Sequence, residues 1–307
     1  MPLSKETCAI LKVCKPLLEE HKVEIGSVFY EKLFTEHPGL KSMFNMSHQA
    51  GEDGKPGRQQ FALGQALVSY CTHCDTLENL GSFVERVANK HVSFDVQPEH
   101  YPVVGGLLLA TLEQVLGKDV FTEDVKNAVA DAYFFLADIF ISKETGIKEK
   151  LMSTEGGWTG WRKMKVVDKI VEAPLYTSLL FAPADDGPLM QYLPGQYISL
   201  KLDLPIVDDG SHFSTVRNYS LSDAPGSGRL RITVKKDGVA SSHLHNQTTI
   251  GDIIEMGVPC GDFVLQPGSE CVFLAAGVGI TPILSIIKES ARKGNKVNFE
   301  GVVKLLI

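Results

Sequence analysis

His91 is the side chain in the first half of the chain best suited to bind a metal ion. It follows Leu80, Val84 and Val87 at helical spacing in LGSFVERVANKHVSF, so a continuous helix places it on an apolar face. A histidine that faces a core is most often a packed residue with its own hydrogen-bond partner. The alternative is an imidazole that ligates iron, which requires a cofactor beside it.

Four other side chains in the same half could line such a cofactor. Tyr30 falls on the apolar side of VEIGSVFYEKLF, and Phe44 opens a loop in SMFNMS. Gln59 stands four residues before Leu63, so the two share one helical face. Together these residues predict a wall for a flat apolar group.

In the second half, residues 217–222 (RNYSLS) alternate as a strand does. A flavin dinucleotide needs a cation for its pyrophosphate, an aromatic side chain against its ring and hydroxyl groups for its polar edges. The R-x-Y-S pattern supplies all three on neighbouring positions. The alternative is an ordinary antiparallel barrel with surface tyrosines.

A glycine turn follows near the C-terminal end of the sequence. The run from Cys271 to Lys296 reads as an apolar strand, the turn GVGITP at 277–282 and an apolar-faced helix, which is the opening of a parallel βα unit. Glycines there let the backbone approach a pyrophosphate, and the following helix offers free N–H groups.

One further motif carries less weight. Cys71 and Cys74 have the two-residue gap of a redox or metal pair, but Asp75 follows where covalent haem attachment needs histidine. No second pair lies at zinc spacing. We expect ordinary helical cysteines.

The spacing of apolar residues changes near residue 150. Before it, apolar residues recur at intervals of three and four between Gly and Pro breakers, which predicts about six helices. From Trp161 onward, polar and apolar residues alternate at 163–167, 196–202 and 229–235, which predicts a small barrel or sandwich. A linker is expected at 154–160.

Size and charge narrow the class of protein. A chain of 307 residues is expected to form two or three domains. Its net charge of −7 disfavours nucleic acid or an anionic membrane surface as the main partner. Six scattered cysteines, no apolar leader and no membrane-length apolar run predict a cytosolic protein without a membrane span, and we expect a monomer.

Residues 1–150 resemble the globin domain of the flavohaemoglobin family. The resemblance rests on FYEKLF at 29–34, MFNMS at 43–47 and NKHVSFDVQPEHYPVVG at 89–105. The roles it implies are a proximal iron ligand of haem b (His91), its partners (Tyr101 and Glu144), a distal polar pair (Tyr30 and Gln59) and packing against the haem and its ligand (Phe44 and Leu63).

The chemistry agrees with these implied roles. A histidine that binds iron donates from its other ring nitrogen, and a carboxylate acceptor such as Glu144 pushes electron density toward the metal. A phenol such as Tyr30 can hydrogen-bond an oxygen that carries partial negative charge. Two alternatives stay open: Tyr101 as a packing residue at a helix start, and Glu144 as a solvated helix end.

The second half resembles the flavin barrels of the ferredoxin-reductase type. PGQY at 194–197, the RNYS strand, GVASSHL at 238–244 and GDF at 261–263 follow one another in that family's order. The resemblance implies FAD contacts at Tyr197, Arg217, Asn218, Tyr219, Ser220 and Ser241, and nicotinamide-nucleotide contacts at Gly277, Val278, Gly279, Ile280, Thr281 and Pro282.

Together the modules resemble flavohaemoglobin over nearly the whole chain. The expected fold is multidomain: an all-α globin domain (1–150), an antiparallel β-barrel FAD domain (158–268) and the start of an α/β nicotinamide domain (269–307). The implied activity is that of a nitric oxide dioxygenase, in which electrons pass from NAD(P)H through FAD to haem and O2 and nitric oxide become nitrate.

The resemblance departs from the family at the end of the sequence. Only 37 residues run from Cys271 to Ile307, whereas a doubly wound domain needs on the order of 100. We therefore expect weakened NAD(P)H binding. Two other functions stay open: a haem protein that carries or senses O2 or nitric oxide without a competent reductase, and a flavin reductase whose helical half is a partner module.

Overall fold

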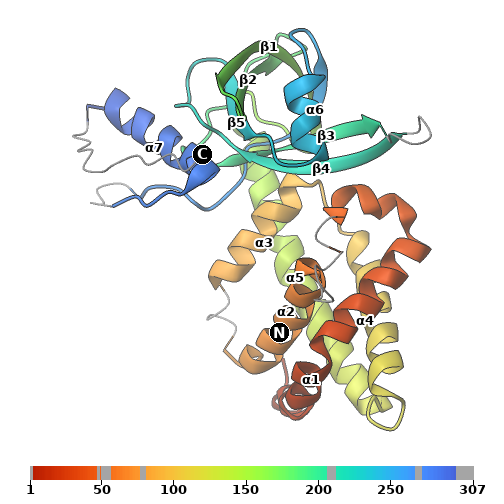
Figure 1. Cartoon of the computed structure of the whole chain (residues 1–307). Coiled ribbons are helices and arrows are strands. Elements are labelled where there is room, and N and C mark those ends of the chain that lie inside the picture. Colours follow the sequence, from red (N-terminus) through yellow and green to blue (C-terminus); the bar gives the residue numbers. More distant parts are fainter. Residues whose placement is uncertain are drawn as a thin grey trace. The chain divides into compact units, whose positions relative to one another are not determined.

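The computed structural model describes residues 3–46, 49, 57–76, 81–205, 212–266 and 272–294. They form two compact units, each with its own hydrophobic core (Figure 1). Unit 1 comprises Met1–Ala88 and Val96–Thr145, and unit 2 comprises Asn89–Asp95 and Gly146–Ile307.

Unit 1 is built from helices, as the apolar spacing predicts. The first helix begins after Ser4, whose Oγ accepts the Thr7 N–H at 2.9 Å and so satisfies one of the free donors at the helix start. It packs against the second and fourth helices. The helices of the chain up to residue 152 are α1 (Lys5–Glu36), the 3-10 helix η1 (Pro38–Met43), α2 (Arg58–His73), α3 (Gly81–Ser93), α4 (His100–Leu116) and α5 (Glu123–Met152); the ends of α3 and α5 belong to unit 2.

Two glycines explain how closely α1 and α2 approach each other. A Cβ on Gly26 of α1 would lie 2.2 Å from the carbonyl oxygen of Gln60. A Cβ on Gly64 of α2 would lie 2.2 Å from the carbonyl oxygen of Lys22. Because only glycine fits at both contacts, the two backbones meet directly. This contact brings the helix that carries Tyr30 against the helix that carries Gln59.

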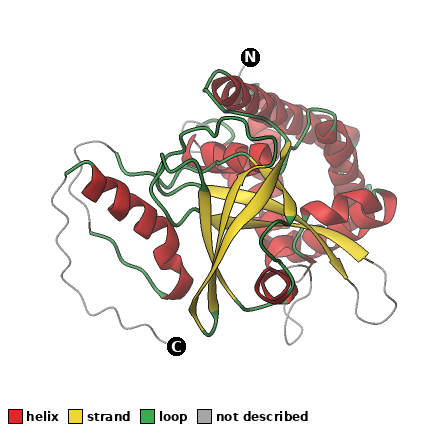
Figure 2. Cartoon of the chain, turned by 90° about the horizontal axis from the view of Figure 1, so that it is seen from above, coloured by secondary structure: helices red, strands yellow, loops and turns green. Residues whose placement is uncertain are grey.

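Unit 2 contains one antiparallel sheet, drawn in yellow in Figure 2, with strand order β4-β3-β6-β1-β2-β5. Leu221, directly after β4, bridges to Ile232 of β5, so the sheet curls toward a barrel. The helix α6 (Val239–Asn246) contacts β3 and β5. The strands are β1 (Trp161–Ala173), β2 (Tyr176–Pro183), β3 (Tyr197–Pro205), β4 (His212–Ser220), β5 (Leu230–Lys235) and β6 (Ile253–Gly257).

Of the predicted βα unit, the described residues form the helix but not the strand. The helix exists as α7 (Ile280–Arg292), which buries Ile283 and Ile286. Residues 272–276 form no strand, and the Val272 and Leu274 side chains are 88 % and 91 % exposed. A strand needs a neighbour to pair its N–H and C=O groups, and none of the described strands pairs with this segment. The predicted strand is therefore wrong over these residues.

Within the described ranges, no helix combines the length and apolarity that a membrane crossing requires.

Candidate functional site

Tyr30 lies in an aromatic cluster in the core of unit 1. Its side chain is buried, and its ring centroid lies 5.6 Å from that of Phe44 and 5.7 Å from that of Phe34. Phe44 directly follows η1 and so begins a loop, as predicted. Leu63 of α2 packs on the same core. Three of the residues predicted to line a cofactor thus lie in one core.

The polar groups of this cluster form a short chain of hydrogen bonds. Tyr30 hydrogen-bonds Gln59, and Gln59 Oε1 accepts from Gln49 Nε2 at 3.0 Å. Burial raises the pKa of Tyr30 to about 12, although the bond with Gln59 acts in the opposite direction. The phenol therefore remains a donor at neutral pH.

Gln49 is a residue that the sequence patterns do not predict, because it lies between helices, where no periodicity applies. Its Oε1 atom is buried and has no hydrogen-bond partner among the described residues. An orphaned buried acceptor beside a phenol and an amide is unusual in a purely structural cluster. The phenol, the two amides and this unpaired acceptor fit a small polar ligand beside an apolar group.

Tyr101 and Glu144 meet on facing helices. The Tyr101 hydroxyl donates to Glu144 Oε1 at 2.5 Å, and both side chains are buried. Burial, and then the hydrogen bond and charge of Glu144, raise the pKa of Tyr101. Glu144 is therefore no solvated helix end, and Tyr101 does more than pack.

His91 lies half-buried on α3, in the part of the helix that belongs to unit 2. Its neighbours contact the barrel: Asn89 Oδ1 accepts from the Gly261 N–H at 3.0 Å, and Lys90 Nζ donates to Asn218 Oδ1 at 2.9 Å. The sequence patterns do not single out Asn89 or Lys90. The only available signal was an amide and a cation directly before the candidate ligand.

The residues of the RNYS motif lie on β4. The register pairs Ser220 with Tyr197 and Asn218 with Ser199 of β3, so four predicted flavin contacts and Tyr197 share one strand pair. Arg217 Nη1 donates to the Thr215 Oγ1 and to the Val216 carbonyl at 2.5 and 2.8 Å.

Electrostatics mark this strand pair as a place for an anion. Desolvation lowers the pKa of Arg217 and raises that of Tyr219 to about 12. The half-buried guanidinium of Arg217 favours an anionic partner, and a phosphate satisfies its planar fork. Tyr197 and Tyr219 are both partly buried, which disfavours an ordinary barrel with surface tyrosines.

PGQY and GDF, which are far apart in the sequence, lie side by side. Tyr197 exchanges backbone hydrogen bonds with Cys260 at 2.9 Å each. Gly261 has φ +126°, and a Cβ there would lie 3.1 Å from the Tyr197 ring. Glycine is therefore required to keep this ring against the loop.

Ser241 closes the start of α6. Its Oγ accepts from the N–H groups of Asp237 and Gly238 at 2.9 Å and donates to the Gly238 carbonyl at 3.0 Å. The hydroxyl proton of Ser241 is thus used within the turn, so its contribution to a phosphate site is first to shape the turn.

The predicted nucleotide turn stands open before α7. Gly277 has φ +53°, and no atom lies within 4 Å of a Cβ built on Gly277 or Gly279. Val278 and Ile280 are exposed, whereas Thr281 is buried and its Oγ1 donates to the Val278 carbonyl at 2.9 Å. Pro282 lies in the first turn of α7, where its missing N–H costs nothing. The open backbone leaves room for a phosphate.

The cysteines of the CTHC motif belong to the core of unit 1. Cys71 and Cys74 are free and buried. Burial raises the pKa of the Cys71 thiol to about 12. No cluster of three or more His, Cys, Asp or Glu side chains suited to a metal ion occurs in the described part of the chain. The motif therefore consists of two packed helical thiols.

Known proteins share both units. Residues 27–139 match the family described as Globin, and residues 164–265 match the Oxidoreductase FAD-binding domain. The Flavohemoprotein of Rhodopirellula baltica is 41 % identical over 298 residues, which cover 93 % of this chain and 70 % of that protein. The Flavohemoprotein of Vibrio cholerae is 40 % identical over 299 residues, with coverages of 95 % and 73 %. The chain belongs to the flavohemoprotein family.

A solved structure from the same family agrees. The flavohemoglobin of Malassezia yamatoensis, with bound FAD and heme, superposes with a TM-score of 0.81 at 27 % identity and covers 95 % of this chain and 75 % of that one. The predicted family and the predicted fold, a globin followed by a ferredoxin-reductase-like FAD barrel, are thereby confirmed. Like other members, this flavohemoprotein is of the oxidoreductase class.

Proposed function

We propose that this flavohemoprotein is a nitric oxide dioxygenase that binds haem b and FAD and takes electrons from NAD(P)H. The observation that carries the proposal is the hydrogen-bonded pair of Tyr30 and Gln59 in a buried aromatic cluster. A family member that only passed electrons from the flavin to external acceptors would have no need of a buried phenol hydrogen-bonded to an amide in this cluster.

When bound, haem iron would supply the binding site for O2 in the conversion of nitric oxide to nitrate, and FAD would supply the one-electron steps that NAD(P)H cannot. His91 would hold the iron, and Tyr101 and Glu144, which hydrogen-bond each other, would support that ligand. Tyr30 donates a hydrogen bond to a substrate oxygen, and Gln59 holds the phenol in place. Phe44 and Leu63 exclude water beside it.

In unit 2, Arg217 would hold the FAD pyrophosphate, and Ser220 and Asn218 would bond polar groups of the flavin. Tyr197 and Tyr219 contact its rings. The turn 277–282 would bind phosphate groups of the nicotinamide nucleotide, and Ser241 would shape the phosphate-binding turn at the start of α6. We assign these sites to a globin domain (1–150), an FAD domain (158–268) and the start of a nicotinamide domain (269–307).

One observation favours a second function. In nucleotide-binding turns of this kind a strand precedes the turn and a helix follows it. Residues 272–276 form no strand, so the turn 277–282 has the helix α7 after it but no described strand directly before it. A haem protein that carries or senses O2 or nitric oxide without a competent reductase would need only unit 1 and His91.

The deciding experiment mixes NADH anaerobically with the purified chain loaded with haem and FAD, and follows the haem bands. Reduction of ferric haem, followed by nitric oxide consumption and nitrate formation on adding O2, supports the dioxygenase. No haem reduction by NADH, with normal O2 and nitric oxide binding after dithionite, supports the carrier or sensor.

The assignment of the iron ligand has its own control. His91→Ala should lose the Soret band and keep the flavin absorbance. The matched variant His21→Ala removes an imidazole of α1 that pairs with the exposed Glu24, and should keep both. A normal Soret band in His91→Ala would overturn the ligand assignment.

A further inference from the structure

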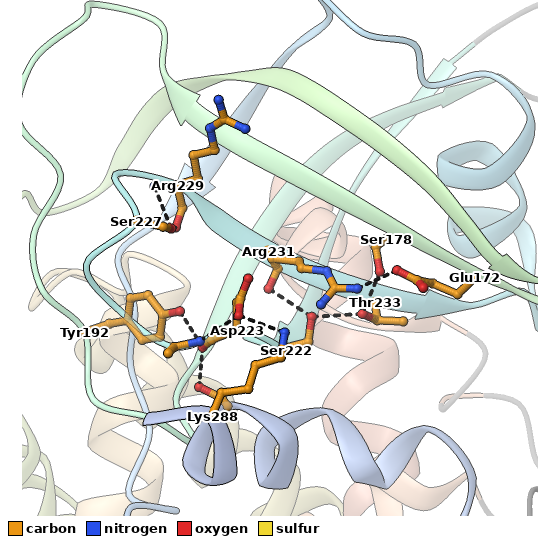
Figure 3. A network of polar contacts seen from close by, with 12 residues as sticks. Glu172, Ser178, Tyr192, Ser222, Asp223, Ser227, Arg229, Arg231, Thr233 and Lys288 are labelled. Carbon is orange, nitrogen blue, oxygen red and sulfur yellow. Dashed lines mark hydrogen bonds and ion pairs between the residues drawn. The ribbon is translucent and has the colours of Figure 1, made fainter. Parts of the chain in front are cut away.

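Asp223, three residues after the RNYS strand, is a meeting point for groups from separate segments (Figure 3). Its carbonyl oxygen accepts two hydroxyl protons, from Tyr192 and from Ser285, each at 2.6 Å. Its carboxylate lies 2.8 Å from Lys288 Nζ and also accepts the Ala224 N–H at 3.0 Å. Ser285 and Lys288 are both on α7.

The two contacts with α7 differ in strength. Ser285 is fully buried, so loss of its hydroxyl leaves a cavity and removes a donor that water cannot easily replace. The Asp223–Lys288 ion pair is about one third exposed on both sides, so solvent screens it. Ile283 and Ile286 are buried on the same face of α7. The hydroxyl contact of Ser285 is therefore the stronger polar restraint on the helix.

Asp223 is itself held by the sheet. The Ser222 N–H donates to the Arg231 carbonyl at 2.8 Å, and Ser222 Oγ and Thr233 Oγ1 lie 2.9 Å apart. Ser178 extends this chain of hydroxyls from Thr233 at 2.9 Å (Figure 3). The Asp223 carbonyl, which accepts the Ser285 hydroxyl, thus directly follows a residue that is hydrogen-bonded to the barrel.

We propose that Asp223 is a positioning residue that ties α7 to the flavin strand. It lies three residues beyond Ser220, and α7 begins directly after the open turn 277–279, so one residue joins the predicted flavin site to the predicted nucleotide site. The role rests on the proposed function, because positioning matters only if a nicotinamide must meet a flavin.

The first test needs no cofactor. Hydrogen exchange of the full chain, read by mass spectrometry on peptides from α7, should be faster in Ser285→Ala by about tenfold, which equals about 1.4 kcal/mol of opening free energy. Lys288→Ala and Asp223→Asn should show smaller increases in exchange rate. The double variant Asp223→Asn/Lys288→Ala should exchange only as fast as the faster of these two single variants. Lys293→Ala is the control, because this lysine pairs only with Glu289 of the same helix among the contacts described for it. Equal exchange in Ser285→Ala and Lys293→Ala overturns the proposal.

The second test separates positioning from stability. In the loaded chain, Ser285→Ala should bind FAD as the wild type does but should reduce it more slowly at saturating NADH, by up to tenfold. Ser285→Thr, which keeps a hydroxyl, should recover part of the rate. A variant that loses FAD occupancy together with rate has a merely structural defect, and this result contradicts the positioning role.

The two proposals fail in different ways. If NADH does not reduce FAD in the wild type, the proposed electron path fails and the positioning role fails with it. If NADH reduces the wild type and Ser285→Ala at the same rate, the positioning role alone is wrong.

Discussion

The Tyr101 hydroxyl and the Glu144 carboxylate form a buried hydrogen bond of 2.5 Å between α4 and α5 of unit 1. The two residues are 43 positions apart, so only the packing of the two helices brings them together. Tyr133 adds a second bond, from its hydroxyl to the Tyr101 carbonyl at 2.8 Å. The pair therefore fixes α4 against α5 whatever group the site binds.

Tyr101→Phe should destabilise unit 1 by about 1.5–3 kcal/mol, because a buried carboxylate loses a donor. Tyr133→Phe is the matched variant, since it removes a hydroxyl bonded to a neutral carbonyl, and should cost about 1 kcal/mol. Urea unfolding followed by circular dichroism at 222 nm reports on this helical unit. An equal loss in the two variants would show that the charge of Glu144 adds nothing.

Tyr30 makes stability depend on pH in the alkaline range. Its pKa is about 12 in the folded chain, because it is buried, and about 10 in the unfolded chain. Since the folded state holds the proton more tightly, the contribution of Tyr30 is complete below pH 10 and is lost as the pH rises toward 12. The free energy of unfolding should fall by about 1 kcal/mol from this residue between pH 9 and 11.

The measurement compares the wild type with Tyr30→Phe by urea unfolding at pH 9 and at pH 11. The wild type should lose more stability than the variant over this interval, by the amount given above. Parallel curves would mean that Tyr30 titrates normally and is accessible to solvent.

Local pattern predicted most of the helices and strands. Tyr30 and Gln59 could be placed on helices from the spacing of their neighbours, and β4 from its alternation. Gln49 could not, because a loop has no period, and Asp223 could not, because its partner Ser285 is 62 residues away. The strand at 272–276 was wrongly predicted because apolar sequence alone does not supply a pairing neighbour.

Arg217→Ala should weaken FAD binding by roughly tenfold to a hundredfold, because a charge-assisted bond to phosphate contributes about 1.5–3 kcal/mol. Arg217→Lys keeps the charge but not the planar fork, so its FAD affinity should lie between those of the wild type and Arg217→Ala. Arg229→Ala is the matched control, since this arginine is exposed in the turn before β5 (Figure 3). Titration of the apoprotein with FAD measures the affinity, and carbon monoxide binding at the haem should not change. A shift in carbon monoxide affinity as large as the loss of FAD would show that the two sites are coupled.

Substitution of two glycines of unit 2 can distinguish the cost of a steric clash from the cost of backbone strain. Both have positive φ, +99° at Gly195 and +69° at Gly228, which L-residues rarely adopt. A Cβ on Gly195 would lie 1.9 Å from the Phe263 carbonyl oxygen, whereas a Cβ on Gly228 meets nothing within 4 Å. Gly228→Ala should therefore cost only the strain, about 1–2 kcal/mol, and Gly195→Ala at least about 3 kcal/mol.

Both tryptophans of the chain, Trp158 and Trp161, belong to unit 2, so their fluorescence during urea unfolding reports on this unit alone. Gly195→Ala should also lower FAD affinity, because the clash pushes the PGQY loop away from the loop of GDF and moves Tyr197, whereas Gly228→Ala should leave FAD affinity unchanged. If both variants lost equal stability, backbone strain alone would explain the glycines, and the contact of the two loops would not be the feature that fixes Tyr197.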